Sequence, residues 1–369
     1  MAMSLAERER RYAFVRERMQ QQGLDVLVVI GRDGANNRGN HRYLSGYGVV
    51  AAFHHYIVFP REPVEPVFFS GESLAILTEN ARGWVRDIRS QLKPQKTVVE
   101  EVRRFKKDGG IGLVEMASVP IPIYLGLVKD FGPDAVRDAA GIFKEARLAK
   151  SAEEIACCRK SAKLADDIYR QLKSIIRPGL SDHEIFGLMS RMIHEGGCEY
   201  LSNLINCADT NALYAPIGNV LSQDGRLSVE ITPAYEGYFT QLRADIPVSV
   251  YREPEQKLLR AWQKAHAAAL AQLKPGARAC DVYRAAADAA RRAGYSPSGR
   301  AGHGIGLDVD EFVSLDPNDE TVLEPGMTVV VHIQLRDKDD RRVMNGGTFL
   351  VTRDGPESLS EVSLLGSAE

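Results

Sequence analysis

The chain has 369 residues, and its 47 Lys and Arg against 49 Asp and Glu leave a formal net charge of −2. This balance argues against a nucleic-acid-binding or membrane-surface protein, because such proteins usually carry a strongly basic face. Hydrophobic residues make up 44% and charged residues 26% of the chain, a globular composition that excludes disorder. At roughly 150 residues per domain, the length predicts two domains.

The amino-terminal half is predicted to form a small α/β domain. After an amphipathic helix, a short β-branched run behind Gly23 predicts a buried strand. Other short apolar runs, separated by Pro and Gly, predict further strands, and two helical patterns alternate with them. The strands are expected at 24–32, 54–60, 64–71 and 110–118, and the helices at 73–88 and 124–132.

Signals for export, membrane insertion and disulfide bonding are not found in the sequence. Charges interrupt the first twenty residues, and no later segment approaches the roughly 18 apolar residues of a membrane span. The five cysteines give an odd count without a metal-binding CxxC spacing. We therefore expect a cytoplasmic protein whose cysteines are buried small apolar residues.

A domain boundary is expected within residues 145–155. Ser151 followed by Glu154 has the spacing of a capping box, in which each side chain binds a free backbone N–H at a helix start. The helix should run to about Ile176, where Pro178 and Gly179 end it. We place the N-terminal domain at 1–146 and the C-terminal domain at 147–369.

The second domain contains two similar units. Ser181 and Glu184 cap a helix that reaches about His194, and a later pair of helices is expected at 255–273 and 279–294. Each unit has an (Arg or Lys)-Pro-Gly turn between its two helices, which suggests an internal duplication. Strands are expected within 226–250, with a hairpin at 235–238, and within 326–335 and 346–355. Helices around a curved sheet would leave a central cleft for a small molecule.

Together these motifs resemble the pita-bread fold of methionine aminopeptidase, aminopeptidase P, prolidase and creatinase. The motifs are Lys150–Ile155, Arg177–Gly179, Tyr235–Tyr238, Gly302–Leu307, Glu324–Met327 and Val351–Gly355. Residues 40–47 are similar to the amino-terminal domain of the prolidase, aminopeptidase P and creatinase branch. The resemblance implies an α/β (α+β) homodimer with a creatinase-like α/β N-terminal domain. Its C-terminal pita-bread domain would wrap duplicated αβ units around a curved antiparallel sheet.

The metal-ligand positions of the family are changed in this chain. Metallopeptidases of the family hold two divalent metals with two Asp, one His and two Glu, because hard cations need several carboxylate oxygens. The five positions fall on Glu230, Gln241, His303, His332 and Gly346. No bridging carboxylate remains, so we expect no dimetal centre and no cofactor. A single divalent metal on Glu230, His303 and His332 stays open.

The resemblance directs attention to polar residues of the expected cleft. A histidine suits acid–base catalysis because its pKa lies near neutral pH, and an arginine can bind a carboxylate through two hydrogen bonds. The stretch that holds the principal histidine of creatinase contains no histidine here, and Tyr214 is nearest. We predict His303, His332 and Glu230 as catalytic residues. Predicted substrate-binding residues are Gln241, Arg243, Tyr214, Asp310, Glu311, His41 and Arg42.

The leading hypothesis is a creatinase- or prolidase-like hydrolase that cleaves a C–N bond without metal. Its substrate would be small and polar, either carboxylate-bearing or derived from an amino acid. A lyase or isomerase in the same cleft, a mononuclear metal enzyme, an Xaa-Pro peptidase-like enzyme and a non-catalytic binding protein are the alternatives. The expected partner is a small molecule, with neither a nucleic acid nor a membrane involved.

Overall fold

The computed structural model describes residues 3–32, 34, 36–48, 53–76, 84–199, 203–208, 213 and 215–362. Contacts divide the chain into two compact units, Met1–Arg147 and Leu148–Glu369. We call them the N-terminal and the C-terminal domain and describe each by itself. No helix in the described ranges is both long enough and apolar enough to cross a membrane.

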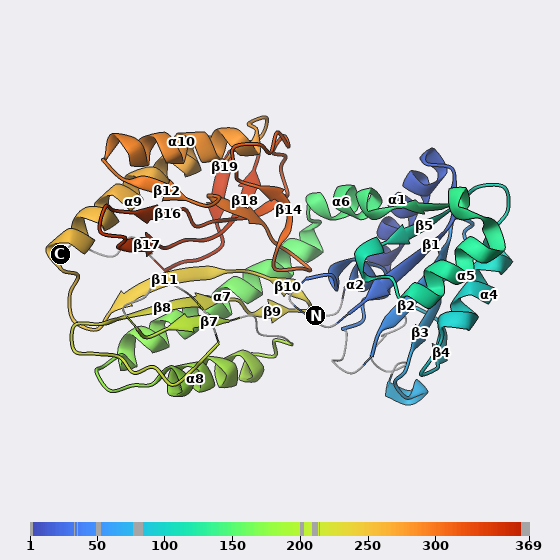
Figure 1. Ribbon diagram of the computed structural model, residues 1–369, viewed down its shortest axis with the longest axis horizontal. Helices are drawn as coiled ribbons and strands as arrows, with labels where there is room; N and C mark the ends of the chain where they lie inside the picture. The colour runs from blue at the N-terminus through green and yellow to red at the C-terminus, as the bar shows by residue number, and fades with distance from the viewer. Residues whose placement is uncertain are drawn as a thin grey trace. The chain divides into compact units, whose positions relative to one another are not determined.

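A six-stranded mixed sheet forms the centre of the N-terminal domain, in the order β4-β3-β2-β1-β5-β6 (Figure 1). Its strands are β1 (Leu24–Gly31), β2 (His55–Pro60), β3 (Val67–Ser70), β4 (Asp87–Ser90), β5 (Gly110–Val114) and β6 (Val136–Asp138). Strand β2 runs antiparallel to β1 and β3, and the other neighbouring pairs are parallel. The helices are α1 (Leu5–Gln21), α2 (Gly39–Ser45), α4 (Gln95–Phe105), α5 (Ile121–Phe131) and α6 (Ala140–Leu148).

Helices cover both faces of this sheet. Every residue of β1 is buried, as expected for a strand whose sequence is continuously apolar. On one face, Val28 of β1 packs in a cluster with Val98 of α4 and Leu127 of α5. On the other face, the ring of Phe59 lies edge-on to Tyr12 of α1, with centroids 5.0 Å apart.

Most of the predicted elements of this domain are present, and two are wrong in part. The strand expected at 110–118 ends at Val114 as β5, and Met116–Ser118 form a 3₁₀ helix. The strands expected at 24–32, 54–60 and 64–71 are β1, β2 and β3, and the helix expected at 124–132 is α5. The helix expected at 73–88 does not reach its predicted end, because Asp87 begins β4 and pairs in parallel with Val67. Tertiary pairing overrides the helical pattern here. Residues 77–83 of that prediction lie outside the described ranges.

Two uncharged histidines lie inside the N-terminal domain. His41 on α2 and His55 on β2 have no exposed surface, and their rings lie 5.2 Å apart. Burial lowers the pKa of His55 to about 3 and, together with the nearby His55, holds the pKa of His41 well below its ordinary value. The folded domain therefore resists protonation that the unfolded chain accepts below about pH 6.5.

We expect the N-terminal domain to lose stability as the pH falls below 6.5. Between the unfolded and folded pKa values the unfolded state binds more protons, which costs about 1.4 kcal/mol per pH unit for each imidazole. Urea unfolding of a Trp262→Phe protein, followed through Trp84, would measure the effect. His55→Phe should remove about half of the loss between pH 7 and pH 5. An unchanged pH dependence in that variant would contradict the assignment.

The described strands of the C-terminal domain form four small sheets. Their orders are β11-β8-β7, β14-β13-β15-β18-β19, β12-β16-β17 and β10-β9. The helices are α7 (Ala152–Ile175), α8 (Asp182–Glu195), α9 (Glu253–Gln272) and α10 (Ala279–Arg292). The first strands are β7 (Leu204–Asn206), β8 (Arg226–Ile231), β9 (Ala234–Tyr235), β10 (Tyr238–Phe239), β11 (Leu242–Pro247) and β12 (Ser296–Ser298). The remaining strands are β13 (Gly302–Gly304), β14 (Glu311–Ser314), β15 (Thr328–Val331), β16 (Gln334–Arg336), β17 (Arg342–Met344), β18 (Gly347–Thr352) and β19 (Gly355–Ser358).

The strands of this domain lie between two pairs of helices (Figure 1). Helices α7 and α8 share a hydrophobic core with β7, β8 and β11. Helices α9 and α10 share a second core with β14 to β18. Each core belongs to one of the two units that the sequence analysis recognised as similar.

Equivalent hydrogen bonds confirm the internal duplication. In each unit, the turn after the first helix bonds to a distant segment through the same three backbone contacts. In the first unit the bonds are Gly179 N to Leu221 O, Leu221 N to Leu180 O and Asp182 N to Asn219 O. In the second unit the equivalent bonds are Gly276 N to Leu323 O, Leu323 N to Ala277 O and Ala279 N to Thr321 O. All six are 2.8 or 2.9 Å long. The two units therefore share their local geometry as well as their order of elements.

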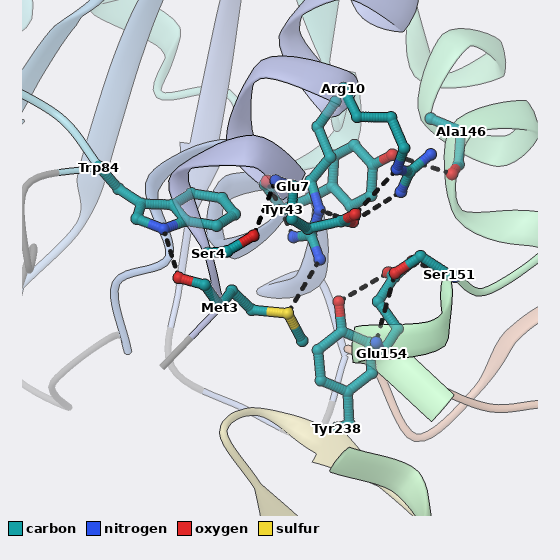
Figure 2. A network of polar contacts seen from close by, with 11 residues as sticks. Met3, Ser4, Glu7, Arg10, Tyr43, Trp84, Ala146, Ser151, Glu154 and Tyr238 are labelled. Atoms are coloured by element: carbon teal, nitrogen blue, oxygen red, sulfur yellow. Dashed lines mark hydrogen bonds and ion pairs between the residues drawn. The ribbon is translucent and has the colours of Figure 1, made fainter. Parts of the chain in front are cut away.

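The predicted capping box joins helix α7 to the hairpin of β9 and β10. Glu154 accepts a hydrogen bond from the backbone of Ser151 at 2.7 Å and another from the hydroxyl of Tyr238 at 2.7 Å (Figure 2). Glu236 and Gly237 between the two strands have φ values of 48° and 83°. Positive φ at both positions is the signature of the tight turn that joins paired strands. The hairpin expected from the sequence is confirmed.

Candidate functional site

Strands β8 and β11 present a polar face in the C-terminal domain. Side chains alternate along paired strands, so Ser228, Glu230, Arg243 and Asp245 share one face. In the antiparallel register, Arg243 lies opposite Glu230 and Asp245 lies opposite Ser228. The intervening residues, such as Val229, belong to the hydrophobic core. A row of buried charged and polar side chains is costly unless its members are paired and hydrogen-bonded, so each of them needs a partner.

Protein acceptors bind one nitrogen, Nη1, of the Arg243 guanidinium group. Its Nη1 donates to the carbonyl oxygens of Val229 and Ala244, at 3.1 and 3.0 Å, and to the Asp245 carboxylate at 3.2 Å. Its Nε is buried without a hydrogen-bond partner. The edge formed by Nε and Nη2, which can bind a carboxylate through two parallel hydrogen bonds, makes no bond to a described residue.

The two duplicated units meet beside this face. Arg243 and Gly346 exchange both backbone hydrogen bonds, each 2.9 Å long. Two residues away in each segment, the backbone N–H of Gln241 donates to the hydroxyl of Thr348 at 2.9 Å. The junction therefore brings Gly346, about 100 residues further along the sequence, beside Gln241 and Arg243.

Gly346 has no room for a side chain. A Cβ atom at this position would lie 2.6 Å from both Cα and Cβ of His332 and would overlap the carbonyl oxygen of Val331. His332 thus occupies the space beside the residue at which the family places its last carboxylate. The loss of that carboxylate is consequently built into the local packing and cannot be reversed by one substitution.

His303 is fixed between two glycines on β13. A Cβ on Gly302 would overlap the carbonyl oxygen of Val330, and a Cβ on Gly304 would overlap that of Phe312. The glycines are therefore required by the neighbouring strands. Strand β14 bulges at this point, and Val313 within the bulge has a φ of 81°, an unusual value for a β-branched residue.

Gly304→Ala is expected to lower the free energy of unfolding of the C-terminal domain by about 3 kcal/mol or more, because the methyl group must displace a strand. Chemical denaturation followed through Trp262 in a Trp84→Phe protein would measure it. The matched control is Gly187→Ala within α8, where a Cβ meets no atom within 4 Å. This control should be neutral or slightly stabilising. Equal effects of the two substitutions would contradict the steric explanation.

One ring nitrogen of His303 is hydrogen-bonded to the protein backbone. Nδ1 lies 2.9 Å from the carbonyl oxygen of Gly304, which can only accept, so Nδ1 carries the proton of the neutral ring. Nε2 then holds a lone pair. The ring of His332 lies 5.0 Å from that of His303, and its Nδ1 is buried without a partner.

Burial moves the pKa values of the histidines and of Glu230 in opposite directions. It lowers the pKa of His303 from 6.5, with Arg300 adding to the effect and Asp310 opposing it. Burial and the nearby His303 hold the pKa of His332 well below 6.5. Burial raises the pKa of Glu230 from 4.5, although Arg243 and a hydrogen bond from Gln241 oppose the shift. Such divergence favours a neutral histidine base and a carboxyl group that retains its proton more readily.

Asp310 and Glu311, two acidic residues predicted to bind substrate, already have protein partners. Asp310 receives two hydrogen bonds from Arg300, one of 3.1 Å to Nη1, and lies 4.0 Å from Nδ1 of His303. Glu311 forms a buried ion pair of 2.8 Å with Lys150. This pair accounts for the burial of Glu311 without a substrate, and its predicted contact with substrate stays a prediction.

The N-terminal domain contains two residues predicted to bind substrate, His41 and Arg42. His41 packs against Phe68 of β3 with ring centroids 5.1 Å apart, and Arg42 is also buried. The placement of His41 favours a structural role, and the predicted substrate contacts of both residues stay predictions. Tyr214 lies outside the described residues.

The residues at the junction do not fit a two-metal centre. The five family positions offer one carboxylate, one amide, two imidazoles and a glycine, which is too little negative charge for two dications. Among the described residues, no three His, Cys, Asp or Glu side chains gather closely enough to hold a metal ion. The single-metal alternative on Glu230, His303 and His332 stays a prediction.

Sequence reasoning missed two polar residues next to this site. Asn203 and Thr232 are buried, and both carry a side-chain atom without a hydrogen-bond partner. Thr232 continues the alternation of Ser228 and Glu230, so the strand pattern could have identified it. Asn203 has no comparable signal, because only folding brings it to Thr232.

The duplicated helix pairs, the joined sheets and the polar junction define a protein of the pita-bread class. The chain belongs to metallopeptidase family M24, which matches residues 156–353. This membership places the chain in a peptidase-like family of hydrolases whose members normally use a divalent metal.

Three comparisons illustrate the relationship. An uncharacterized peptidase of Staphylococcus epidermidis is 25% identical over 269 residues, covering 70% of this chain and 75% of that protein. An Xaa-Pro dipeptidase of Lactobacillus delbrueckii subsp. lactis is 24% identical over 323 residues, covering 84% of this chain and 85% of that protein. The prolidase structure from Pyrococcus horikoshii matches with a TM-score of 0.82 at 19% identity, covering 96% of this chain and 99% of the prolidase. These matches confirm the predicted fold.

Proposed function

We propose that this chain is a creatinase- or prolidase-like hydrolase that cleaves a C–N bond without a metal ion. Its substrate is small and polar, either carboxylate-bearing or derived from an amino acid. The carrying observation is the composition of the junction, where two imidazoles, a carboxyl group and an arginine adjoin a glycine too crowded to regain a metal-binding side chain. Polar replacements at these positions favour a rebuilt catalytic site.

His303 is the proposed general base. Its Nε2 is the unprotonated nitrogen of the neutral ring, because Nδ1–H donates to Gly304. Its lowered pKa keeps this form dominant at neutral pH. His332, also neutral, can donate or accept one hydrogen bond to position the substrate or the attacking water.

The proposed reaction is a balanced hydrolysis. Nε2 of His303 takes a proton from water as the water oxygen bonds to the carbon of the C–N bond. When that bond breaks, the leaving nitrogen takes a proton from the Glu230 carboxyl group, whose raised pKa favours the protonated form. Transfer of the proton from His303 to Glu230 through water then restores both groups.

Arg243 is the proposed anchor for a substrate carboxylate. Because protein acceptors hold Nη1, the substrate is offered the edge of Nε and Nη2. A carboxylate bound there gains two charge-assisted hydrogen bonds and remains beside Glu230 and His332. A preference for acidic substrates over their amides follows from this arrangement.

A substrate screen tests the proposal. Small amides, ureas, guanidino acids and Xaa-Pro dipeptides should include a compound whose cleavage requires His303, Glu230 and Arg243. Incorporation of labelled water oxygen into the product would establish hydrolysis, whereas turnover without incorporation would identify a lyase or isomerase. Binding without turnover by the wild-type protein would identify a binding protein. Turnover that needs one bound metal ion would instead support the mononuclear alternative.

A further inference from the structure

Three buried polar atoms beside the junction have no hydrogen-bond partner among the residues that the structure describes. They are Nδ2 of Asn203, Oγ1 of Thr232 and Oε1 of Gln241. The three residues expose 5%, 0% and 4% of their surface, so bulk solvent does not satisfy these atoms. Each unpaired buried polar atom calls for an explanation, and a bound molecule or an ordered water is one that the protein atoms alone do not show.

The three side chains lie at one end of the β8–β11 hairpin. Ile231 pairs with Leu242, and the same register continued by one residue places Thr232 opposite Gln241. The Oδ1 atom of Asn203 accepts the backbone N–H of Thr232 at 2.8 Å, which fixes Asn203 at the same end. Its unpartnered Nδ2 belongs to the same amide group.

The chemistry of the three atoms is that of a neutral recognition site. Asn203 offers a donor, Gln241 an acceptor and Thr232 a hydroxyl that can do either. A carboxylate would satisfy the donor but would leave the oxygen of Gln241 facing another acceptor. An amide-type group satisfies both, because its carbonyl oxygen accepts while its N–H donates.

We propose that Asn203, Thr232 and Gln241 form a subsite for an amide-type group of the substrate, such as a carboxamide, ureido or N-acyl group. The inference rests on the proposed function and narrows its substrate class. Gln241 directly precedes β11 and lies two residues before Arg243, about 7 Å along the extended chain. The substrate therefore carries an amide-type group and, at a matching spacing, a carboxylate for Arg243.

Ligand binding to the His303→Gln protein tests the subsite without consuming the ligand. The probes are N-carbamoylglycine and pentanoate, which have equal chain length and a carboxylate but differ in the ureido group. N-carbamoylglycine should bind at least about tenfold more tightly by calorimetry. If the three atoms hold only water, the two ligands bind equally, and the subsite is refuted. Failure of both to bind also refutes it.

Matched variants locate the preference. Gln241→Leu and Asn203→Leu, each added to His303→Gln, should abolish the tenfold difference and leave the affinity for pentanoate nearly unchanged. Gln171→Leu makes the same chemical change on the exposed side of α7 and should preserve the difference. A preference that survives at Gln241 and Asn203 would overturn the assignment. If either variant fails to fold, the comparison of the two ligands in the His303→Gln protein still tests whether the subsite exists.

The outcomes separate this inference from the proposed function. A ureido preference in a protein that hydrolyses no compound of the screen would retain the subsite and reject the hydrolase. Turnover of a substrate that has no amide-type group, with equal binding of the two probes, would retain the hydrolase and reject the subsite.

Discussion

Replacement of His303 by Gln is expected to lower kcat by about 10³-fold with little change in KM, because a positioned acid–base group contributes about 10² to 10⁴ to the rate. Glutamine retains hydrogen bonding but cannot take up a proton near neutral pH. Steady-state kinetics on a substrate found by the screen would measure the loss. His194→Gln, an exposed histidine on α8, is the matched control and should leave kcat unchanged.

The pH dependence distinguishes catalysis by His303 from a structural role. His303 acts as a base in its neutral form, and burial lowers its pKa from 6.5. The acid limb of kcat/KM should therefore lie below pH 6.5 in the wild-type protein and vanish from the residual activity of His303→Gln. The assignment would be wrong if this limb lay above pH 6.5, or if it persisted in the variant.

Breaking the buried ion pair of Lys150 and Glu311 is expected to lower the free energy of unfolding of the C-terminal domain by about 3 to 5 kcal/mol. Their side chains are 3% and 4% exposed and lie 2.8 Å apart. Glu311→Gln or Lys150→Met leaves the other charge buried without its partner. Denaturation followed through Trp262 in a Trp84→Phe protein would give the value.

A double variant and a surface pair provide the controls. Lys150→Met combined with Glu311→Leu removes both charges and should recover most of the loss, because well-packed apolar residues can replace a buried ion pair. Lys163→Met removes an exposed pair with Asp167 and should change stability by less than about 0.5 kcal/mol. If Glu311→Gln altered KM and not stability, Glu311 would be a substrate ligand instead.

The fold could be predicted largely because its signals are local or repeated. The capping box of Ser151 and Glu154 lies within one helical turn, and the structure confirms it. The similar units at 177–179 and 274–276 indicated a duplication that equivalent hydrogen bonds confirm. The helix expected at 73–88 was wrong in part because β4 depends on pairing with β3, which no local pattern encodes.

The candidate site was less predictable because its arrangement depends on distant contacts. Lys150 and Glu311 are separated by 161 residues, so their pairing could not be read from either motif. The need for glycine at Gly302 and Gly304 also depends on the neighbouring strands, which the local sequence does not show. Period-two alternation does place Glu230 on the polar face with Arg243, whereas Asn203 meets Thr232 only through the fold.

The central claim is that a rebuilt polar junction has replaced the family's metal centre, and metal analysis of active protein tests it most directly. Protein produced with manganese, cobalt and zinc available should be analysed for metals per chain and assayed before and after dialysis against a chelator. We predict no stoichiometric metal and undiminished hydrolysis after chelation. Two metal ions per chain, with activity lost on their removal and restored on their return, would contradict the account.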